Sequence, residues 1–221
     1  MVPLLRYLVT HHYPDYRAAL AGEDGLLAPM VVAALERHLE GYDRSEGRPW
    51  GWKVCETAYA MPVIRTLFPQ ARCIHLMRDG RDVAFCDHTG PVDAYWRKIF
   101  FGRADIETWR DMKLDGPSYR RRPHLFNAQH WLASVSLGHR TACELGAQCL
   151  ELRYEDLIQN PHASAARLFT FLGLGDRTKS LPAVHPDSMG KFRHQPRLKL
   201  REVLALIEPL QRALGYPVSE T

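Results

Sequence analysis

The chain has 221 residues, 46% of them hydrophobic, which is enough to bury one sizeable core, so we expect a single domain spanning residues 1–221. It carries 29 basic against 25 acidic side chains, a formal net charge of +4 that favours anionic partners. No apolar run approaches the roughly 20 residues of a membrane helix. The N-terminus also lacks the layout of a signal peptide. These features exclude membrane-spanning classes and predict a soluble cytoplasmic protein with no membrane partner.

The cysteines and histidines indicate a reduced protein without a metal. The cysteines are odd in number, form no Cys-x-x-Cys pair and lie inside apolar segments: Cys55, Cys73, Cys86, Cys143 and Cys149. The eleven histidines form no His-Glu-x-x-His pattern and no clustered Cys/His spacing, so we expect no metal. His75 is interpreted as a hydrogen-bonded core residue rather than as a ligand.

The first third of the chain predicts helices separated by a loop and a short strand. Apolar residues recur at helical spacing over 27–39, and Pro29 falls in the first turn, where a missing N–H is tolerated. The stretch GYDRSEGRPWGWK is typical of a loop, after which the bulky residues of 50–55 predict a short strand. A second helix opens at Pro62 and stops at Pro69.

A strand followed directly by a helix is predicted around residue 78. The apolar run 72–77 is typical of a buried strand in a parallel sheet. The sequence Arg-Asp-Gly-Arg-Asp follows, and a helix is expected over 81–87 with Asp82 in its first turn, facing the positive end of the helix dipole. This charged motif therefore lies at a strand-to-helix junction.

The remaining elements continue this alternation of strands and helices. Residues 95–122 are rich in aromatic and basic side chains and suit a lid. A long helix is predicted over 125–145, with Gly146 as its stop, followed by a strand over 149–154. A further helix runs from Pro161 to residue 172 and is closed by Gly173.

This order predicts an α/β fold with a mostly parallel sheet. In such sheets ligands bind at the carboxyl ends of the strands, where Arg78 and Tyr154 are expected. The strongest local charge bias is the segment 188–201, which contains no acidic residue. Its cations are Lys191, Arg193, Arg197, Lys199 and Arg201.

Three stretches together resemble sulfotransferases that use 3′-phosphoadenosine 5′-phosphosulfate, in particular the bacterial type. They are LFPQARCIHLMRDGRDVAFC, LELRYEDLIQNPHASAARLFTFLGL and the shorter SMGKFR, and the resemblance covers roughly residues 50–193. The resemblance implies a fold related to P-loop nucleotide-binding proteins, with helices on both sides of a mostly parallel sheet. It also implies a sulfuryl transfer that needs no metal, with a small-molecule, glycan or lipid acceptor and no nucleic-acid partner.

The resemblance assigns donor-binding roles to several residues. It places Arg78 on the 3′-phosphate, a role that suits a bidentate guanidinium. Cys86 stands where the family has a serine that donates to the same phosphate. Because a thiol is a poor donor, this contact is expected to be weak, although backbone N–H groups at the helix start can serve the anion. Tyr154 matches the tyrosine beside the adenine, and Lys191 and Arg193 match the basic loop that closes over the 3′-phosphate.

Two further residues are candidates for catalysis. Lys53 matches a lysine that acts near the transferred sulfuryl group, where a positioned ammonium helps most in the transition state. The family also needs a base for the acceptor, and Glu56 is the nearest candidate, although its spacing departs from the family motifs.

The Gly-rich loop that cradles the 5′-phosphosulfate in this family has no counterpart here. The N-terminal region offers only Gly22 and Gly25, with two acidic residues between them that would repel an anion. The first strand and its loop are therefore expected to be missing, through truncation or through loss of the chemistry in a natural relative. An open sheet edge would favour a homodimer.

Each assignment has a structural alternative. Arg78 and Arg81 can pair with Asp79 and Asp82 at a solvated turn, and Lys53 can be an ordinary surface lysine. Tyr154 can be a core aromatic, Glu155 and Asp156 are interpreted as structural caps, and Glu56 can lack a catalytic role. The basic run 188–201 can be a solvated helix face.

The sequence thus supports three functions unequally. The first is a sulfotransferase acting on a hydroxyl or amine acceptor. The second is a catalytically degenerate relative that binds a nucleotide or a partner without turnover. A P-loop kinase or other nucleoside triphosphatase is disfavoured because the Walker lysine loop is missing.

Overall fold

The computed structural model describes residues 1–219, except 14, 24, 41–48, 87–121 and 176–188. The chain divides into two compact units, Met1–Ala71 and Arg72–Thr221. The lid expected over 95–122 lies, apart from Arg122, outside the described residues. In the part of the chain that is described, no helix is long and apolar enough to cross a membrane. The single domain stays a prediction.

The first unit is helical in the segments that the structure describes. Its elements are α1 (Val2–His12), α2 (Arg17–Ala21), α3 (Leu27–His38), the 3₁₀ helix η2 (Cys55–Ala58) and α4 (Met61–Leu67). Helix α1 buries Leu4, Leu5 and Leu8, whose spacing places them on one face. The Tyr16 hydroxyl donates to the Tyr59 carbonyl at 2.6 Å. The predicted helices at 27–39 and after Pro62 are confirmed as α3 and α4.

The strand predicted over 50–55 is wrong. Residues 50–54 adopt no regular structure, and η2 begins at Cys55. The two tryptophans that suggested a strand pack locally instead: the rings of Trp50 and Trp52 lie 5.9 Å apart, and both contact Phe68. Trp52 Nε1 also donates to Thr57 at 3.0 Å. Ring packing within this segment, rather than pairing with another strand, accounts for the alternation of bulky residues.

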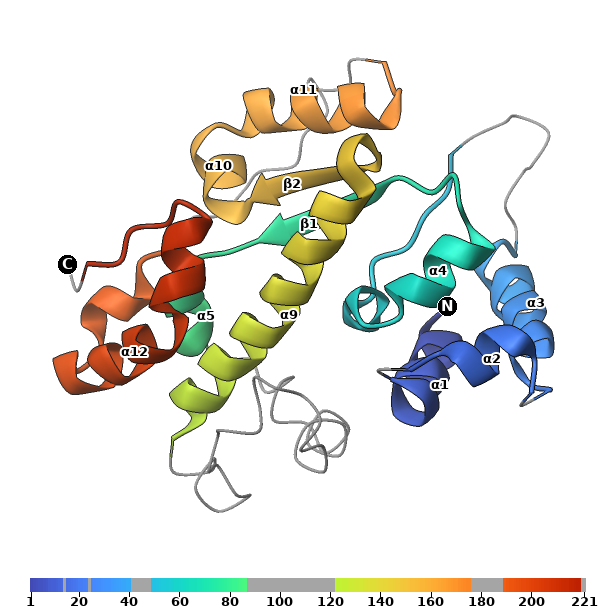
Figure 1. The fold of residues 1–221 in the computed structure, drawn as a ribbon. Helices are drawn as coiled ribbons and strands as arrows, with labels where there is room; N and C mark the ends of the chain where they lie inside the picture. Colours follow the sequence, from blue (N-terminus) through green and yellow to red (C-terminus); the bar gives the residue numbers. More distant parts are fainter. Residues whose placement is uncertain (14, 24, 41–48, 87–121, 176–188, 220–221) are drawn as a thin grey trace. The chain divides into compact units, whose positions relative to one another are not determined.

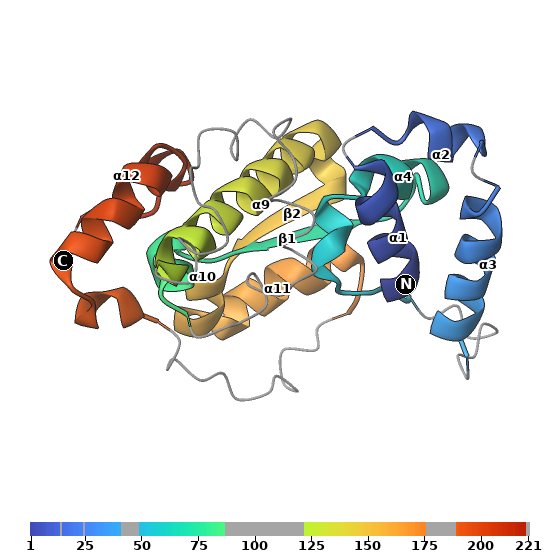
Figure 2. The same ribbon diagram turned by 90° about the horizontal axis from the view of Figure 1, so that it is seen from below.

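The second unit is an α/β structure (Figures 1 and 2). Its elements are β1 (Cys73–Met77), α5 (Gly80–Ala84), α9 (Pro123–Leu145), η4 (Gly146–Gln148), β2 (Cys149–Arg153), α10 (Tyr154–Gln159), α11 (Pro161–Leu172), η7 (Lys191–His194) and α12 (Arg197–Ala213). Strands β1 and β2 are parallel neighbours, in a register that runs from Cys73 beside Cys149 to Met77 beside Arg153. The predicted α/β class is confirmed, as are both strands of this unit and the helices α9 and α11.

The two faces of this strand pair are covered unequally. Helix α9 lies on one face and α11 on the other (Figure 2). Because side chains alternate along a strand, His75 points toward α9 while Ile74 and Leu76 point to the opposite face. There Ile74 is 44% and Leu76 51% exposed, because α10 and α11 pack against β2 rather than β1. The prediction that this strand is buried is therefore wrong for one of its faces.

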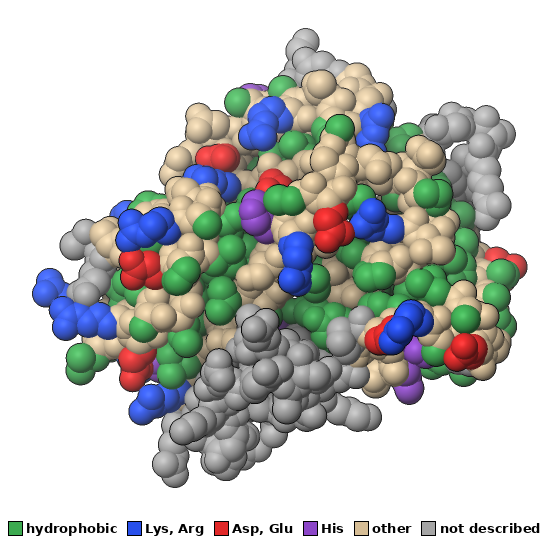
Figure 3. Space-filling view, viewed as in Figure 1, with side chains coloured by type: hydrophobic (Ala, Val, Ile, Leu, Met, Phe, Trp, Pro, Cys, Tyr) green, Lys and Arg blue, Asp and Glu red, His purple; other side chains and the backbone are tan. Residues whose placement is uncertain are grey.

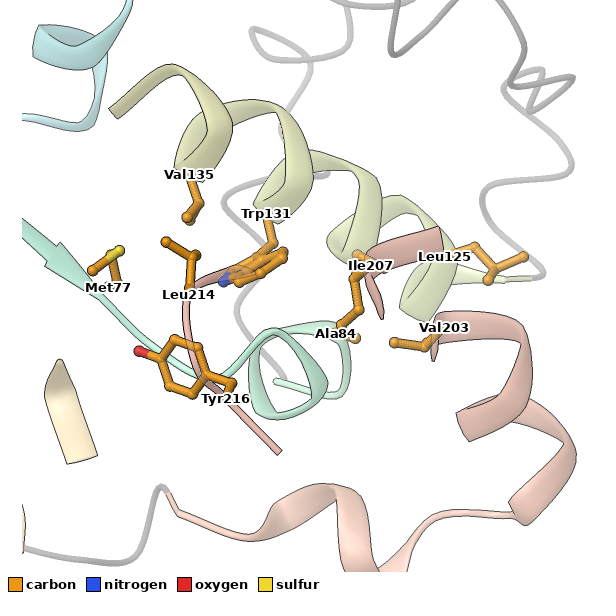
Figure 4. Close-up of a cluster of buried hydrophobic side chains, with 10 residues drawn as sticks. Met77, Ala84, Leu125, Trp131, Val135, Val203, Ile207, Leu214 and Tyr216 are labelled. Carbon is orange, nitrogen blue, oxygen red and sulfur yellow. The ribbon is translucent and has the colours of Figure 1, made fainter. Parts of the chain in front are cut away.

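One hydrophobic cluster joins β1, α5, α9 and α12 (Figure 4). Trp131 of α9 is only 2% exposed. It belongs to the same cluster as Met77 from β1 and Ile207 from α12. The indole Nε1 of Trp131 donates to the carbonyl of Arg78 at 2.8 Å. The core of this unit thereby fixes the backbone of the Arg-Asp-Gly-Arg-Asp turn.

Candidate functional site

The turn after β1 is built around a buried ion pair. Asp79 caps α5 by accepting a hydrogen bond from the Arg81 backbone N–H at 2.9 Å. The same carboxylate holds the Arg81 guanidinium, with 2.7 Å between Nη2 and Oδ2, and the two side chains are only 4% and 8% exposed. The Arg81 guanidinium also stacks on Phe192, 3.9 Å from the ring centroid. Arg81 and Asp79 therefore form the structural ion pair that was the alternative interpretation. The pair is buried, however, so the expectation that this turn is solvated is wrong here.

Side chains from distant elements hold the turn in place. The backbone N–H of Asp79 donates to Glu155 at 2.8 Å, and that of Gly80 donates to Gln211 at 3.1 Å. Together with the cap on Arg81, these bonds engage three successive N–H groups at the start of α5. The backbone contact to an anion expected at this helix start therefore cannot use these three groups without breaking bonds that hold the turn.

Arg78 and Tyr154 meet at the carboxyl ends of the two parallel strands. Met77 and Arg153 are register partners, so the next residues, Arg78 and Tyr154, leave the sheet side by side. The Arg78 guanidinium carbon lies 5.4 Å from the centre of the Tyr154 ring. The Arg78 side chain is 23% exposed, unlike that of Arg81, and can still face solvent or a ligand.

Asp82 joins Arg78 to the basic loop. Its carboxylate accepts hydrogen bonds from the backbone N–H groups of Gly190 at 2.8 Å and Phe192 at 3.3 Å. The same Oδ2 atom lies 3.9 Å from Nη2 of Arg78, too far for a hydrogen bond. The loop that carries Lys191 and η7 is thus fastened beside Arg78. A shared anion site of Arg78 and Lys191 stays a prediction.

The basic side chains of this segment differ in exposure. Lys191 is half-buried, and Arg193 is exposed with its guanidinium 5.7 Å from the Phe192 ring. Further along, Arg197, Lys199 and Arg201 are exposed at the start of α12. Figure 3 shows Lys and Arg side chains gathered where α12 lies. These last three cations lie on α12 and are exposed, as the alternative of a solvated helix face predicted. Lys191 lies before α12, in η7.

Glu155 is a half-buried acceptor whose pKa is raised. Burial raises its pKa, and the nearby Asp79 carboxylate raises it further, while the hydrogen bond from the Asp79 N–H acts in the opposite direction. Burial also raises the pKa of Tyr216, and the charge of Glu155 adds to this shift. Its bond to the turn gives Glu155 the structural role that was its expected interpretation.

Cys86 lies two residues beyond the end of α5. Its backbone N–H donates to Val83 at 3.2 Å, and its carbonyl accepts from Asn127 at 3.4 Å. Cys86 is half-buried. Helix α5 ends at Ala84, so the thiol follows the helix rather than lying on a continuous helical face with Arg78. Its contact with a phosphate stays a prediction.

Lys53 and Glu56 belong to the first unit, and the structure defines their surroundings within that unit. Lys53 is exposed in the irregular segment before η2. Glu56 is 5% exposed, and its Oε1 accepts from Nε of Arg6 at 3.0 Å. Because Oε1 is engaged by this guanidinium, Arg6 would have to release it before that oxygen could take a proton from an acceptor.

The supporting residues of the turn were missed by the sequence analysis. Gln211 lies 131 residues from Gly80, and nothing in the amphipathic pattern of α12 marks it as a turn partner. Trp131 was expected in a helix but without a contact to Arg78. The only available signal was chemical: a glutamine at a core position of an apolar helix face needs a polar partner. Among the described residues, no group of three or more His, Cys, Asp or Glu side chains is arranged to hold a metal ion.

Comparison with known proteins identifies one matching family model. A model described as the sulfotransferase family matches residues 5–177, which include the turn at Arg78, the strand β2 and Tyr154. Comparisons with curated proteins and with solved structures give no match.

Proposed function

The chain belongs to the sulfotransferase family, and we propose that it transfers a sulfuryl group from 3′-phosphoadenosine 5′-phosphosulfate to a hydroxyl or amine acceptor. One observation carries this proposal: Arg78 and Tyr154 meet at the carboxyl ends of two parallel strands. The guanidinium carbon of Arg78 lies 5.4 Å from the centre of the Tyr154 ring. A basic loop is fastened beside them through Asp82. Ligands of open parallel sheets bind at this edge.

The residues around Arg78 fit the nucleotide half of this donor. A 3′-phosphate carries close to two negative charges, for which a partly exposed guanidinium is a suitable bidentate partner. The second cation, Lys191, comes from the loop bound to Asp82. Tyr154 offers a flat ring beside Arg78 on which an adenine can lie. Arg193, two residues further along η7, would close over the phosphate, and Cys86 would add a weak thiol contact.

The catalytic roles fall to residues of the first unit. Lys53 is exposed and carries the ammonium proposed to stabilise charge on the transferred group. Glu56 is the proposed base, released from Arg6 when the acceptor binds. The acceptor is a small molecule, glycan or lipid with a hydroxyl or amine, the protein acts in the cytoplasm, and a homodimer is a compatible assembly.

Calorimetric titration with adenosine 3′,5′-bisphosphate, run beside adenosine 5′-monophosphate, tests the donor site. We expect micromolar binding of the bisphosphate and at least ~10-fold weaker binding of the monophosphate, because the 3′-phosphate makes the charge-assisted contacts. Arg78→Ala should remove about 2 kcal/mol of binding free energy, the contribution of a hydrogen bond to a charged group. Arg212→Ala is the matched control, since this exposed arginine pairs with Glu208 on the outer side of α12. Equal binding of the two nucleotides would contradict the proposed site.

One observation favours a second function, a relative that binds the nucleotide without turnover. Glu56 is buried and already paired with Arg6, so the proposed base is engaged. Incubation with the sulfated donor and simple phenols, amines and sugars separates the two functions. Binding of the bisphosphate together with no consumption of the donor would support the binding module, whereas release of the bisphosphate together with an equal amount of sulfated acceptor would establish the transferase.

A further inference from the structure

A cluster of nucleophilic and titratable side chains lies on the α9 face of the strand pair, outside the site described above. The Glu151 carboxylate of β2 accepts from two histidines: Nδ1 of His75 in β1 at 2.9 Å, and Nδ1 of His139 in α9 at 3.0 Å. The other ring nitrogen of His139, Nε2, lies 3.9 Å from the sulfur of Cys143, one helical turn along α9. Cys143 is exposed.

The hydrogen bonds fix the tautomer of His139. An ionised carboxylate only accepts, so the Nδ1 atom that faces Glu151 must carry the proton. In the neutral ring, Nε2 is then an acceptor, and the thiol of Cys143 is the group within its reach. This order, a carboxylate holding an imidazole whose free nitrogen faces a nucleophile, is the arrangement that activates thiols and hydroxyls in catalytic sites.

Close packing holds the cluster in this geometry. The His75 ring lies against Gly138 of α9, where an added Cβ would come within 2.4 Å of its Nε2. His75 is therefore held between the strand and the helix, and its bond orients Glu151 toward His139. The spacing of four residues between His139 and Cys143 places both on the same side of α9.

We propose that Cys143 is a modification site: a nucleophilic thiol that reacts with soft electrophiles and low-molecular-weight disulfides, with His139 as its base and Glu151 as a positioning residue. In alkylation, the sulfur forms a bond to carbon, the leaving group departs, and the thiol proton moves to Nε2 of His139. In exchange with a disulfide, the sulfur forms a new S–S bond, the old S–S bond breaks, and the departing thiolate takes up that proton.

Two other cysteines provide internal comparisons. Cys55 is exposed like Cys143 but is the first residue of the short 3₁₀ helix η2. Cys149 is half-buried on β2, and burial, followed by the charges of Cys73 and Glu151, raises its pKa to about 11. Because the thiolate is the reacting form, Cys149 is expected to be inert at neutral pH.

Alkylation with iodoacetamide at neutral pH, followed by peptide mass spectrometry at each cysteine, tests the proposal in the full chain. We expect Cys143 to react about 10-fold faster than Cys55. His139→Gln should reduce the Cys143 rate to that of Cys55, and its side chain is 37% exposed, so folding should tolerate the change. Equal rates for Cys143 and Cys55 in the unchanged protein would overturn the proposal.

Glu151→Gln separates positioning from a general loss of structure. If Glu151 orients the imidazole, the Cys143 rate falls while Cys149 stays unreactive. If the substitution merely loosens β2, Cys149 becomes reactive together with Cys143, and the positioning role is wrong. Incubation with glutathione disulfide is a second measurement: a mass gain at Cys143 that dithiothreitol reverses supports the proposal, and a gain spread evenly over Cys55 and Cys143 contradicts it.

Discussion

Gly80 lies where three side chains converge on the start of α5. A Cβ at this position would lie 2.7 Å from Ile207, 2.9 Å from Trp131 and 3.0 Å from Gln211. Gly80→Ala should therefore reduce the free energy of unfolding by about 2 kcal/mol through overpacking, measured by urea denaturation. Gly175→Ala is the control, because nothing lies within 4 Å of its added carbon. Equal stability of the two variants would show that the core yields at Gly80 without cost.

Glu155 makes the stability of the protein depend on pH in a defined direction. Its pKa is raised above the ordinary 4.5 in the folded protein, so the folded state binds the proton more tightly than the unfolded state. This group therefore stabilises the fold more as the pH falls through its raised pKa, and less as the pH rises. Relative to the unchanged protein, Glu155→Gln should therefore gain stability as the pH rises above 4.5, the ordinary pKa of this group. Parallel urea titrations at a series of pH values above 4.5 check it, and a constant difference between the proteins would contradict it.

At the residue scale, the positions of Arg78 and Tyr154 at the strand ends were easier to predict than the residues that support them. Arg78 follows one predicted strand and Tyr154 ends the other, and parallel pairing then brings them together. The partners that hold the turn, Glu155 and Gln211, are separated from it by 76 and 131 residues. No local pattern encodes such contacts, since they depend on how α10 and α12 pack.

The attachment of α12 to α5 rests on Gln211, which is fully buried. Its side chain accepts from the Gly80 N–H at 3.1 Å and donates to Asp79 at 2.6 Å. Gln211→Met would preserve the volume but leave both groups buried without their partner, so we expect a loss of about 2 kcal/mol in unfolding free energy. The measurement is urea unfolding monitored by circular dichroism.

The neighbouring Arg212 provides the matched control for this change. It forms an exposed pair with Glu208 one turn away, so Arg212→Met should cost less than about 1 kcal/mol. A similar loss for both variants would show that the helix itself, and not its buried bond to α5, was weakened.

At the element scale, the periodicity of apolar residues predicted an element correctly where one face of that element is buried. It failed where the bulky side chains pack against near neighbours in the chain. The helices α3, α9 and α11 were predicted because apolar spacing and Pro or Gly punctuation agree. The alternation at Trp50 and Trp52 has the period of a strand, but here it serves contacts between aromatic rings. A short alternating run cannot distinguish these two causes, because both place every second side chain on one side.

For the whole molecule, the division into two units separates the residues predicted for donor binding from those predicted for catalysis. Arg78, Tyr154 and Lys191 belong to the second unit, while Lys53 and Glu56 belong to the first. Apart from Glu56, whose spacing departs from the family motifs, these residues were predicted from local motifs that resemble the family. Their separation into two units has no local signature, because it depends on which segments share a core.

This division predicts that binding and turnover respond to different substitutions in the full chain. Lys53→Ala should change the affinity for adenosine 3′,5′-bisphosphate by less than about 2-fold. The Lys53 ammonium is proposed to stabilise charge on the transferred sulfuryl group, and this nucleotide has no sulfuryl group. Donor turnover should fall on the order of 10²-fold, the usual loss when one group that stabilises transition-state charge is removed. Arg78→Ala should instead weaken binding of the bisphosphate and of the donor alike. Calorimetry with the bisphosphate and an assay of donor consumption measure the two effects separately. If Lys53→Ala weakened bisphosphate binding as strongly as Arg78→Ala, Lys53 would be a nucleotide-binding residue. The proposed assignment of donor binding to one unit and catalysis to the other would then be wrong.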